Sequence, residues 1–137
     1  MTYLLDTNVL SETRKTNRNP GLEQWIGDMP MERLHLSVIT VGEVEKGIAK
    51  VRERGDHRQA ALFESWLDDV VDKFGERIVP VTTEIAREWG TQSGRRPVSI
   101  ADALIAATAR VHNLRLVTRN VKDFEDAGVR VLNPFTD

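Results

Sequence analysis

The chain has 137 residues, of which 40% are hydrophobic and 29% charged, a balance typical of a globular protein with a packed core. It contains no cysteine, which excludes disulfides, thiolate zinc sites and cysteine nucleophiles, so its chemistry must come from carboxylates, hydroxyls or three histidines. No apolar run approaches the roughly 18 residues of a membrane helix. We therefore expect a single domain over residues 1–137, in the cytoplasm and without membrane association.

The charge balance is weakly acidic, with a formal net charge of -2 and an isoelectric point near 5.9. Proteins that bind nucleic acids usually have a basic surface, so this value argues against such a partner. If four of the acids are neutralised by a bound metal, however, 17 acidic residues remain against 19 lysines and arginines. The net charge is therefore only a weak objection to a nucleic-acid substrate.

Apolar runs, helical periodicity and turn residues alternate along the chain in a repeated strand–helix pattern. In chain order, the predicted elements are a strand over Thr2–Leu5, a helix from Asn8, a helix over Pro20–Ile26, a strand over Leu34–Ile39, a helix from Thr40, a helix over Leu62–Phe74, a strand over Ile78–Val81, a helix over Thr83–Trp89, a loop over Thr91–Pro97, a helix from Ser99, a strand over Leu114–Thr118, a helix over Val121–Ala127 and a strand over Val129–Leu132. Because parallel strands need crossover connections, this alternation predicts an α/β fold of three layers (α/β/α) around a parallel sheet of four to five strands.

Four acids follow predicted strands or open predicted helices. Asp6 comes directly after the first strand and Glu43 lies in the first turn after the second. Asp102 opens a later helix, and Asp123 follows the fourth strand closely. Ligands of such sheets bind beyond the carboxyl ends of the strands, where these four side chains can meet.

A cluster of four carboxylates requires protons or cations. Two carboxylates about 5 Å apart repel by about 3 kcal/mol at an effective dielectric constant near 20. Oxygen ligands without cysteine favour Mg²⁺ or Mn²⁺, and such an ion beside a few carboxylates is typical of phosphodiester chemistry. The pattern thus predicts a metal-dependent phosphodiesterase.

Taken singly, each of the four acids also has a structural interpretation. Thr40 with Glu43, and Ser99 with Asp102, match the spacing of helix capping boxes. Asp6 could serve a turn, and Asp123 could be an ordinary surface residue. Separate capping roles do not explain why all four acids occupy equivalent strand ends, so we favour the shared site.

Four blocks of sequence together resemble a PIN domain, and they span nearly the whole chain. The blocks are Tyr3–Glu12, Ser37–Glu43 with Gly47, Ala101–Ala106 and Val117–Phe124. Within that superfamily the chain is similar to the VapC toxins of bacterial toxin–antitoxin pairs, close to the FitB-like branch.

The resemblance implies an endoribonuclease whose divalent metal is held by Asp6, Glu43, Asp102 and Asp123. It also implies a homodimer that is inhibited by a small antitoxin encoded beside it. Asn8 and Thr118 match polar positions that support the site in the family. Asn120 stands where many relatives carry an additional acid, which bears on a second metal position.

Three other functions fit parts of the pattern. A phosphoaspartyl phosphatase needs a second acid two residues after its nucleophile, where this chain has Asn8. A receiver-like signalling domain needs a phosphorylatable aspartate ending a middle strand, but Asp56 lies in a charged segment. The third alternative is a catalytically inert PIN-like module that only binds RNA or protein, and the presence of all four acids counts against it.

Several basic and aromatic residues have weaker functional interpretations. The histidines His35, His57 and His112 lack any spacing typical of a zinc site. Basic side chains near the predicted site loops could hold phosphates or simply be solvated: Arg14, Lys15, Arg18, Arg95, Arg96 and Arg119. Trp66 and Phe74 could belong to the core or line a groove for a partner helix.

Overall fold

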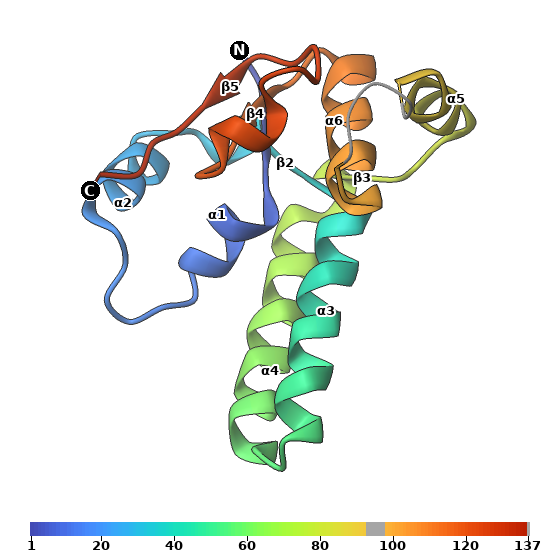
Figure 1. The fold of residues 1–137 in the computed structure, drawn as a ribbon. Helices are drawn as coiled ribbons and strands as arrows, with labels where there is room; N and C mark the ends of the chain where they lie inside the picture. Colours follow the sequence, from blue (N-terminus) through green and yellow to red (C-terminus); the bar gives the residue numbers. More distant parts are fainter. Residues whose placement is uncertain (93–97, 137) are drawn as a thin grey trace.

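The central sheet confirms the predicted α/β architecture. A computed structural model describes residues 1–92 and 98–136 (Figure 1). Its five strands are β1 (Tyr3–Leu5), β2 (Leu34–Ser37), β3 (Ile78–Val79), β4 (Arg115–Val117) and β5 (Val131–Leu132). All neighbours pair in parallel, in the order β3-β2-β1-β4-β5. The chain therefore builds outward from β1 in one direction and then returns to the other side of β1 with β4.

Helices cover both faces of this sheet. The α-helices are α1 (Thr7–Glu12), α2 (Pro20–Gly27), α3 (Val38–Glu53), α4 (His57–Phe74), α5 (Thr83–Gln92) and α6 (Ile100–His112). Short 3₁₀ turns are η1 (Met31–Arg33), η2 (Gly75–Arg77) and η3 (Val121–Phe124). Figure 1 shows α3 and α4 as a long antiparallel hairpin that projects away from the sheet. No helix within residues 1–92 and 98–136 is long and apolar enough to cross a membrane.

Alternating side chains on the central strands create two cores. Tyr3 and Leu5 of β1 pack with buried residues of α1 to α4, whereas Leu4 packs against α6 and Leu116 on the opposite face. Successive side chains of a strand point to opposite faces, and both faces here are apolar. The middle layer is thus buried on both sides, as a three-layer fold requires.

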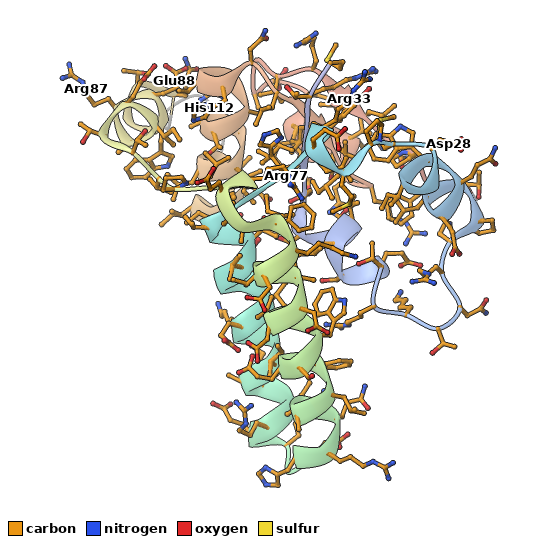
Figure 2. The ribbon with its side chains drawn as sticks, turned by 180° about the vertical axis from the view of Figure 1, so that it is seen from behind. Asp28, Arg33, Arg77, Arg87, Glu88 and His112 are labelled. Carbon is orange, nitrogen blue, oxygen red and sulfur yellow. The ribbon has the colours of Figure 1, made fainter. Side chains whose placement is uncertain are left out.

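The base of the α3–α4 hairpin is attached to the sheet through Arg77. Its Nε donates a hydrogen bond to the carbonyl oxygen of Leu34 on β2 (3.0 Å) and its guanidinium lies 5.2 Å from the Phe74 ring centroid. Figure 2 shows this arginine from behind, where the hairpin meets the sheet. Phe74 itself is buried, in agreement with the core interpretation of that residue.

Several predicted element boundaries are wrong. The second strand ends at Ser37 instead of Ile39, because the buried Ser37 hydroxyl accepts the Ile39 N–H (3.0 Å) and starts α3 at Val38. The helix predicted from Leu62 begins at His57, because Asp56 caps it through the Gln59 N–H.

Two further predicted boundaries, in the second half of the chain, also differ from the structure. The helix α5 runs on to Gln92, into the loop predicted over Thr91–Pro97, while residues 93–97 lie outside the described residues. The helix predicted over Val121–Ala127 is the 3₁₀ turn η3, which ends at Phe124.

Candidate active site

Asp6 lies at the point where the strand order reverses. It follows β1, and its Oδ2 accepts a hydrogen bond from the hydroxyl of Thr118, which directly follows β4 (2.8 Å). In open parallel sheets the crevice between such strands, at their carboxyl ends, is the usual ligand site. The Asp6–Thr118 hydrogen bond therefore spans the topological switch point of this fold.

Asp6 is only 4% exposed, and its carboxylate serves two purposes. Its Oδ1 accepts the Thr7 N–H (2.8 Å) and caps α1, in line with the turn role considered for this residue, while Oδ2 also accepts from Asn8 Nδ2 (3.1 Å). Burial raises its pKa and the nearby charge of Glu43 raises it further, whereas its hydrogen bonds lower it. Capping alone leaves unexplained why a second acid faces this buried carboxylate.

Asn8 and Thr118 join the ends of β1 and β4 into one network. Asn8 Nδ2 lies 3.3 Å from the Thr118 hydroxyl, and Asn8 Oδ1 accepts the Arg119 N–H (3.1 Å). The Thr118 hydroxyl also accepts the Asn120 N–H (3.0 Å). These contacts hold Asp6 in a defined orientation, while the role of both residues in supporting a metal site stays a prediction.

Glu43 reaches the same edge of the sheet from α3. Its Oε1 accepts a hydrogen bond from the Thr7 hydroxyl (2.5 Å), and this hydroxyl also lies 3.3 Å from that of Thr40. The capping-box interpretation of Thr40 and Glu43 is wrong, because α3 begins two residues earlier, at Val38. The Thr7 contact was missed by sequence reasoning, since the two residues are 36 positions apart and only the place of Thr7 beside Asp6 hinted at a role.

Asp102 lies in the first turn of α6. The hydroxyl of Ser99 accepts its backbone N–H (3.0 Å), so the predicted cap at Ser99 is present. Burial raises the pKa of the Asp102 carboxyl from 3.8 to about 6, with further increases from the charges of Asp6, Glu43 and Asp123, while a hydrogen bond from Ser99 lowers it. Its carboxylate is therefore within electrostatic range of the three other predicted acids.

Asp123 is the most exposed of the four acids. It lies in η3, and its charge contributes to the raised pKa of Asp102. Among the described residues, no three histidine or acidic side chains are close enough together to coordinate one metal ion as they stand. The four acids thus share one edge of the sheet without a closed coordination shell, and their role as ligands stays a prediction.

The chemistry of the donor set fits a hard divalent cation. All candidate donors are oxygens. Burial raises the pKa of Asp6 and of Asp102, and the charges of neighbouring acids raise both further, so a bound cation would stabilise the ionised carboxylates. Metal ligands must be deprotonated, so binding of an ion would favour the ionised form of these carboxyls and lower their pKa values.

Three of the six basic residues considered from the sequence make contacts away from the four acids. Lys15 pairs with Glu12 (2.9 Å), Arg18 pairs with Glu23 (3.4 Å), and the Arg14 guanidinium lies 4.1 Å from the Phe63 ring centroid. Trp66 is half-buried beside the same arginine. Arg95 and Arg96 lie outside the described residues, while Arg119 lies next to the site.

The strand order and the acids at its switch point define an α/β protein with a carboxylate site between β1 and β4. A receiver-like domain would show the order 2-1-3-4-5, which this sheet does not have. The chain belongs to the PIN domain family, whose model matches residues 3–129.

Within that family the relatives include named toxins and ribonucleases. Toxin FitB of Neisseria gonorrhoeae is 33% identical over 140 residues, covering 98% of this chain and 99% of FitB. A VapC ribonuclease of Sinorhizobium fredii is 32% identical over 138 residues and covers 96% of each chain. The crystal structure of FitAcB from Neisseria gonorrhoeae matches with a TM-score of 0.86 at 30% identity, covering 97% of this chain and 98% of that chain. A toxin–antitoxin complex from Klebsiella pneumoniae matches with a TM-score of 0.69 at 29% identity, over 99% of this chain and 100% of that chain.

Proposed function

We propose that this protein is a metal-dependent endoribonuclease and the toxin of a type II toxin–antitoxin pair, acting in the cytoplasm. The observation that carries the proposal is the buried Asp6 at the switch point of the sheet, hydrogen-bonded to Thr118, with Glu43 held by the neighbouring Thr7 and the charge of Asp102 close by. Relatives of similar length are named as a VapC ribonuclease and a tRNA(fMet)-specific endonuclease, which supports RNA as the substrate.

The four acids would hold Mg²⁺ or Mn²⁺. When bound, such an ion supplies electrophilic activation of the phosphoryl group and a more acidic water, so no protein nucleophile is needed. The chain contributes orientation: Thr118 and Asn8 fix the Asp6 carboxylate, and Thr7 fixes that of Glu43. Residues fixed by such hydrogen bonds need little rearrangement before they act.

The direct test is RNA cleavage in the presence of Mg²⁺ and in the presence of chelator. Asp6→Asn, Glu43→Gln and Asp102→Asn should each lower the rate at least a hundredfold with the fold retained, because each removes charge from one shared site with little change in volume. Exposed Asp69→Asn on α4 is the matched control and should cleave normally. Full activity in any two of the three site variants would refute the assignment.

We also propose that an antitoxin encoded beside the gene covers part of the α3–α4 hairpin and brings a basic side chain toward the acids. Leu62 and Val71 on α4 are 58% and 38% exposed, so this hairpin retains apolar surface. A disordered tail can cover such a surface while its charge offsets that of the acids.

The antitoxin proposal is tested with the purified partner from the neighbouring reading frame. Protection of α3 and α4 from hydrogen exchange, together with loss of cleavage, is expected. Inhibition by a partner that protects only the opposite face would contradict it. Sedimentation of the free protein tests the proposed homodimer, which predicts about twice the monomer mass of 15.5 kDa.

A further inference from the structure

An open hollow of about 460 Å³ lies beside the candidate site, at the carboxyl ends of β4 and β5. Its lining combines cations, amides, an aliphatic side chain and one of the four acids: Arg119, Asn120, Val121, Lys122, Asp123 and Asn133. None of the roles described above uses the space itself. Asp123 lines this hollow and is also one of the four proposed metal ligands.

Arg119 is held in a fixed relation to that site. Its backbone N–H donates to Asn8 Oδ1 (3.1 Å), and the preceding Thr118 donates to buried Asp6. Its guanidinium lies 4.8 Å from the Phe135 ring centroid. Its charge helps to lower the pKa of Glu12, but in the described part of the chain it forms no salt bridge within 4.0 Å. Stacking on a ring uses the face of a guanidinium and leaves its in-plane N–H groups available to an anion.

The rest of the lining suits a nucleotide. Val121 is 36% exposed and offers an apolar surface to a base or ribose. Asn133 Oδ1 accepts the Phe135 N–H (3.0 Å), which orients an amide whose Nδ2 donates to no group among the described residues. Amide side chains read base edges, and in RNA these edges are accessible mainly where the strand is unpaired.

A cation at this position would also offset the repulsion between the RNA phosphates and the four acids. RNA brings a chain of negative phosphates to a sheet edge that already holds four acids, and lysine or arginine contacts to phosphate supply much of the affinity of such complexes. Arg119 is a cation of the hollow whose backbone is bonded directly into the Asp6 network.

We propose that this hollow binds the ribonucleotide next to the scissile phosphate of single-stranded RNA, with Arg119 contacting the phosphate and Asn133 the base edge. The inference rests on the proposed ribonuclease function and assigns one subsite of its substrate. Arg119 is a binding residue in this account, so its loss should affect RNA affinity more than turnover.

The test compares Arg119→Met with Arg87→Met, because methionine keeps an unbranched apolar chain and removes the charge. Arg87 is exposed on α5, at the far end of the molecule from β5 (Figure 2). The probe is a fluorescein-labelled single-stranded RNA of 12 nucleotides, with binding followed by anisotropy in chelator. Steady-state cleavage in Mg²⁺ is measured alongside, and melting temperatures establish that the variants fold.

Arg119→Met should weaken RNA binding and raise KM about tenfold with kcat nearly unchanged. It should also reduce the slope of log K for RNA binding against log salt concentration by about 0.7 in magnitude. Arg119→Lys should recover most of the affinity, Asn133→Ala should change the distribution of cleavage sites, and Arg87→Met should match the wild type. If the wild type cleaves RNA while Arg119→Met retains its KM and salt dependence, the hollow is not a subsite and the nuclease function stands. If Arg119→Met weakens binding but no chain cleaves RNA, the proposed ribonuclease function fails, and with it the assignment of the hollow beside a scissile phosphate, while the hollow stands as an RNA-binding site.

Discussion

Replacing Asp102 by asparagine should stabilise the metal-free protein at mildly alkaline pH. Folding raises the pKa of the Asp102 carboxyl from 3.8 to about 6, which corresponds to a free-energy penalty of about 3 kcal/mol on the folded state when this carboxyl is ionised. The side chain is only partly buried, so solvent screening reduces this to about 1.5 kcal/mol. Asparagine also loses about 0.5 kcal/mol of favourable interaction between a carboxylate and the N-terminus of α6. The net gain is about 1 kcal/mol, or roughly 3–5 °C in melting temperature.

The sign of this effect depends on pH. A folded-state pKa raised above the unfolded value penalises the folded wild type above about pH 6, and the penalty fades as the pH falls toward 3.8. Thermal unfolding followed by circular dichroism in chelator should therefore separate Asp102→Asn from wild type at about pH 8 and bring them together near pH 4. Asp69→Asn, at an exposed position of α4, should stay within about 0.5 kcal/mol of wild type at both values. A lower melting temperature for Asp102→Asn at about pH 8, or an equal gain at both values, would refute the reasoning.

Three further changes probe the supports of the site and the fold. Thr118→Val removes the 2.8 Å hydrogen bond to Asp6 and should cost about 1–3 kcal/mol in chemical denaturation, with Thr118→Ser close to wild type. The hydrogen bond with Lys15 lowers the pKa of Glu12, so Glu12→Gln should lower the free energy of unfolding by about 1 kcal/mol at neutral pH. The difference from wild type should vanish as acid protonates the native carboxylate, and a loss of stability independent of pH would contradict this. Gly21→Ala would place a Cβ 2.6 Å from the Pro134 carbonyl oxygen and should lower the melting temperature, whereas Gly27→Ala meets nothing within 4 Å and should not.

The fold could be predicted from the sequence because its signals are local. The alternation of apolar strands with periodic helices is sufficient to predict a parallel sheet covered on both faces. Asp6 follows β1 directly, so its place at the sheet edge is a consequence of the strand assignment alone. Ser99 was likewise recognisable as a cap from its spacing to Asp102.

The fine structure of the site depends on contacts that leave no local signal. Ser37 and Thr40 are both good capping residues, but Ser37 caps α3 and also ends the pairing of β2 with β3, where it lies opposite Val79. The Thr118–Asp6 hydrogen bond joins residues 112 positions apart. The proximity of such pairs can be predicted only when the strand order is known, and many strand orders are compatible with the same alternation of elements.

The central claim is that the four acids form one divalent-cation site. Binding of Mn²⁺, followed by electron paramagnetic resonance of the free ion, tests it without reference to any RNA. We predict that Mn²⁺ binds the wild type saturably and that Mg²⁺ displaces it. Asp6→Asn and Asp102→Asn should each weaken the Mn²⁺ affinity about tenfold or more, since either change removes a ligand charge. Equal Mn²⁺ binding by the wild type and both variants, or no binding by the wild type at millimolar Mn²⁺, would contradict the claim.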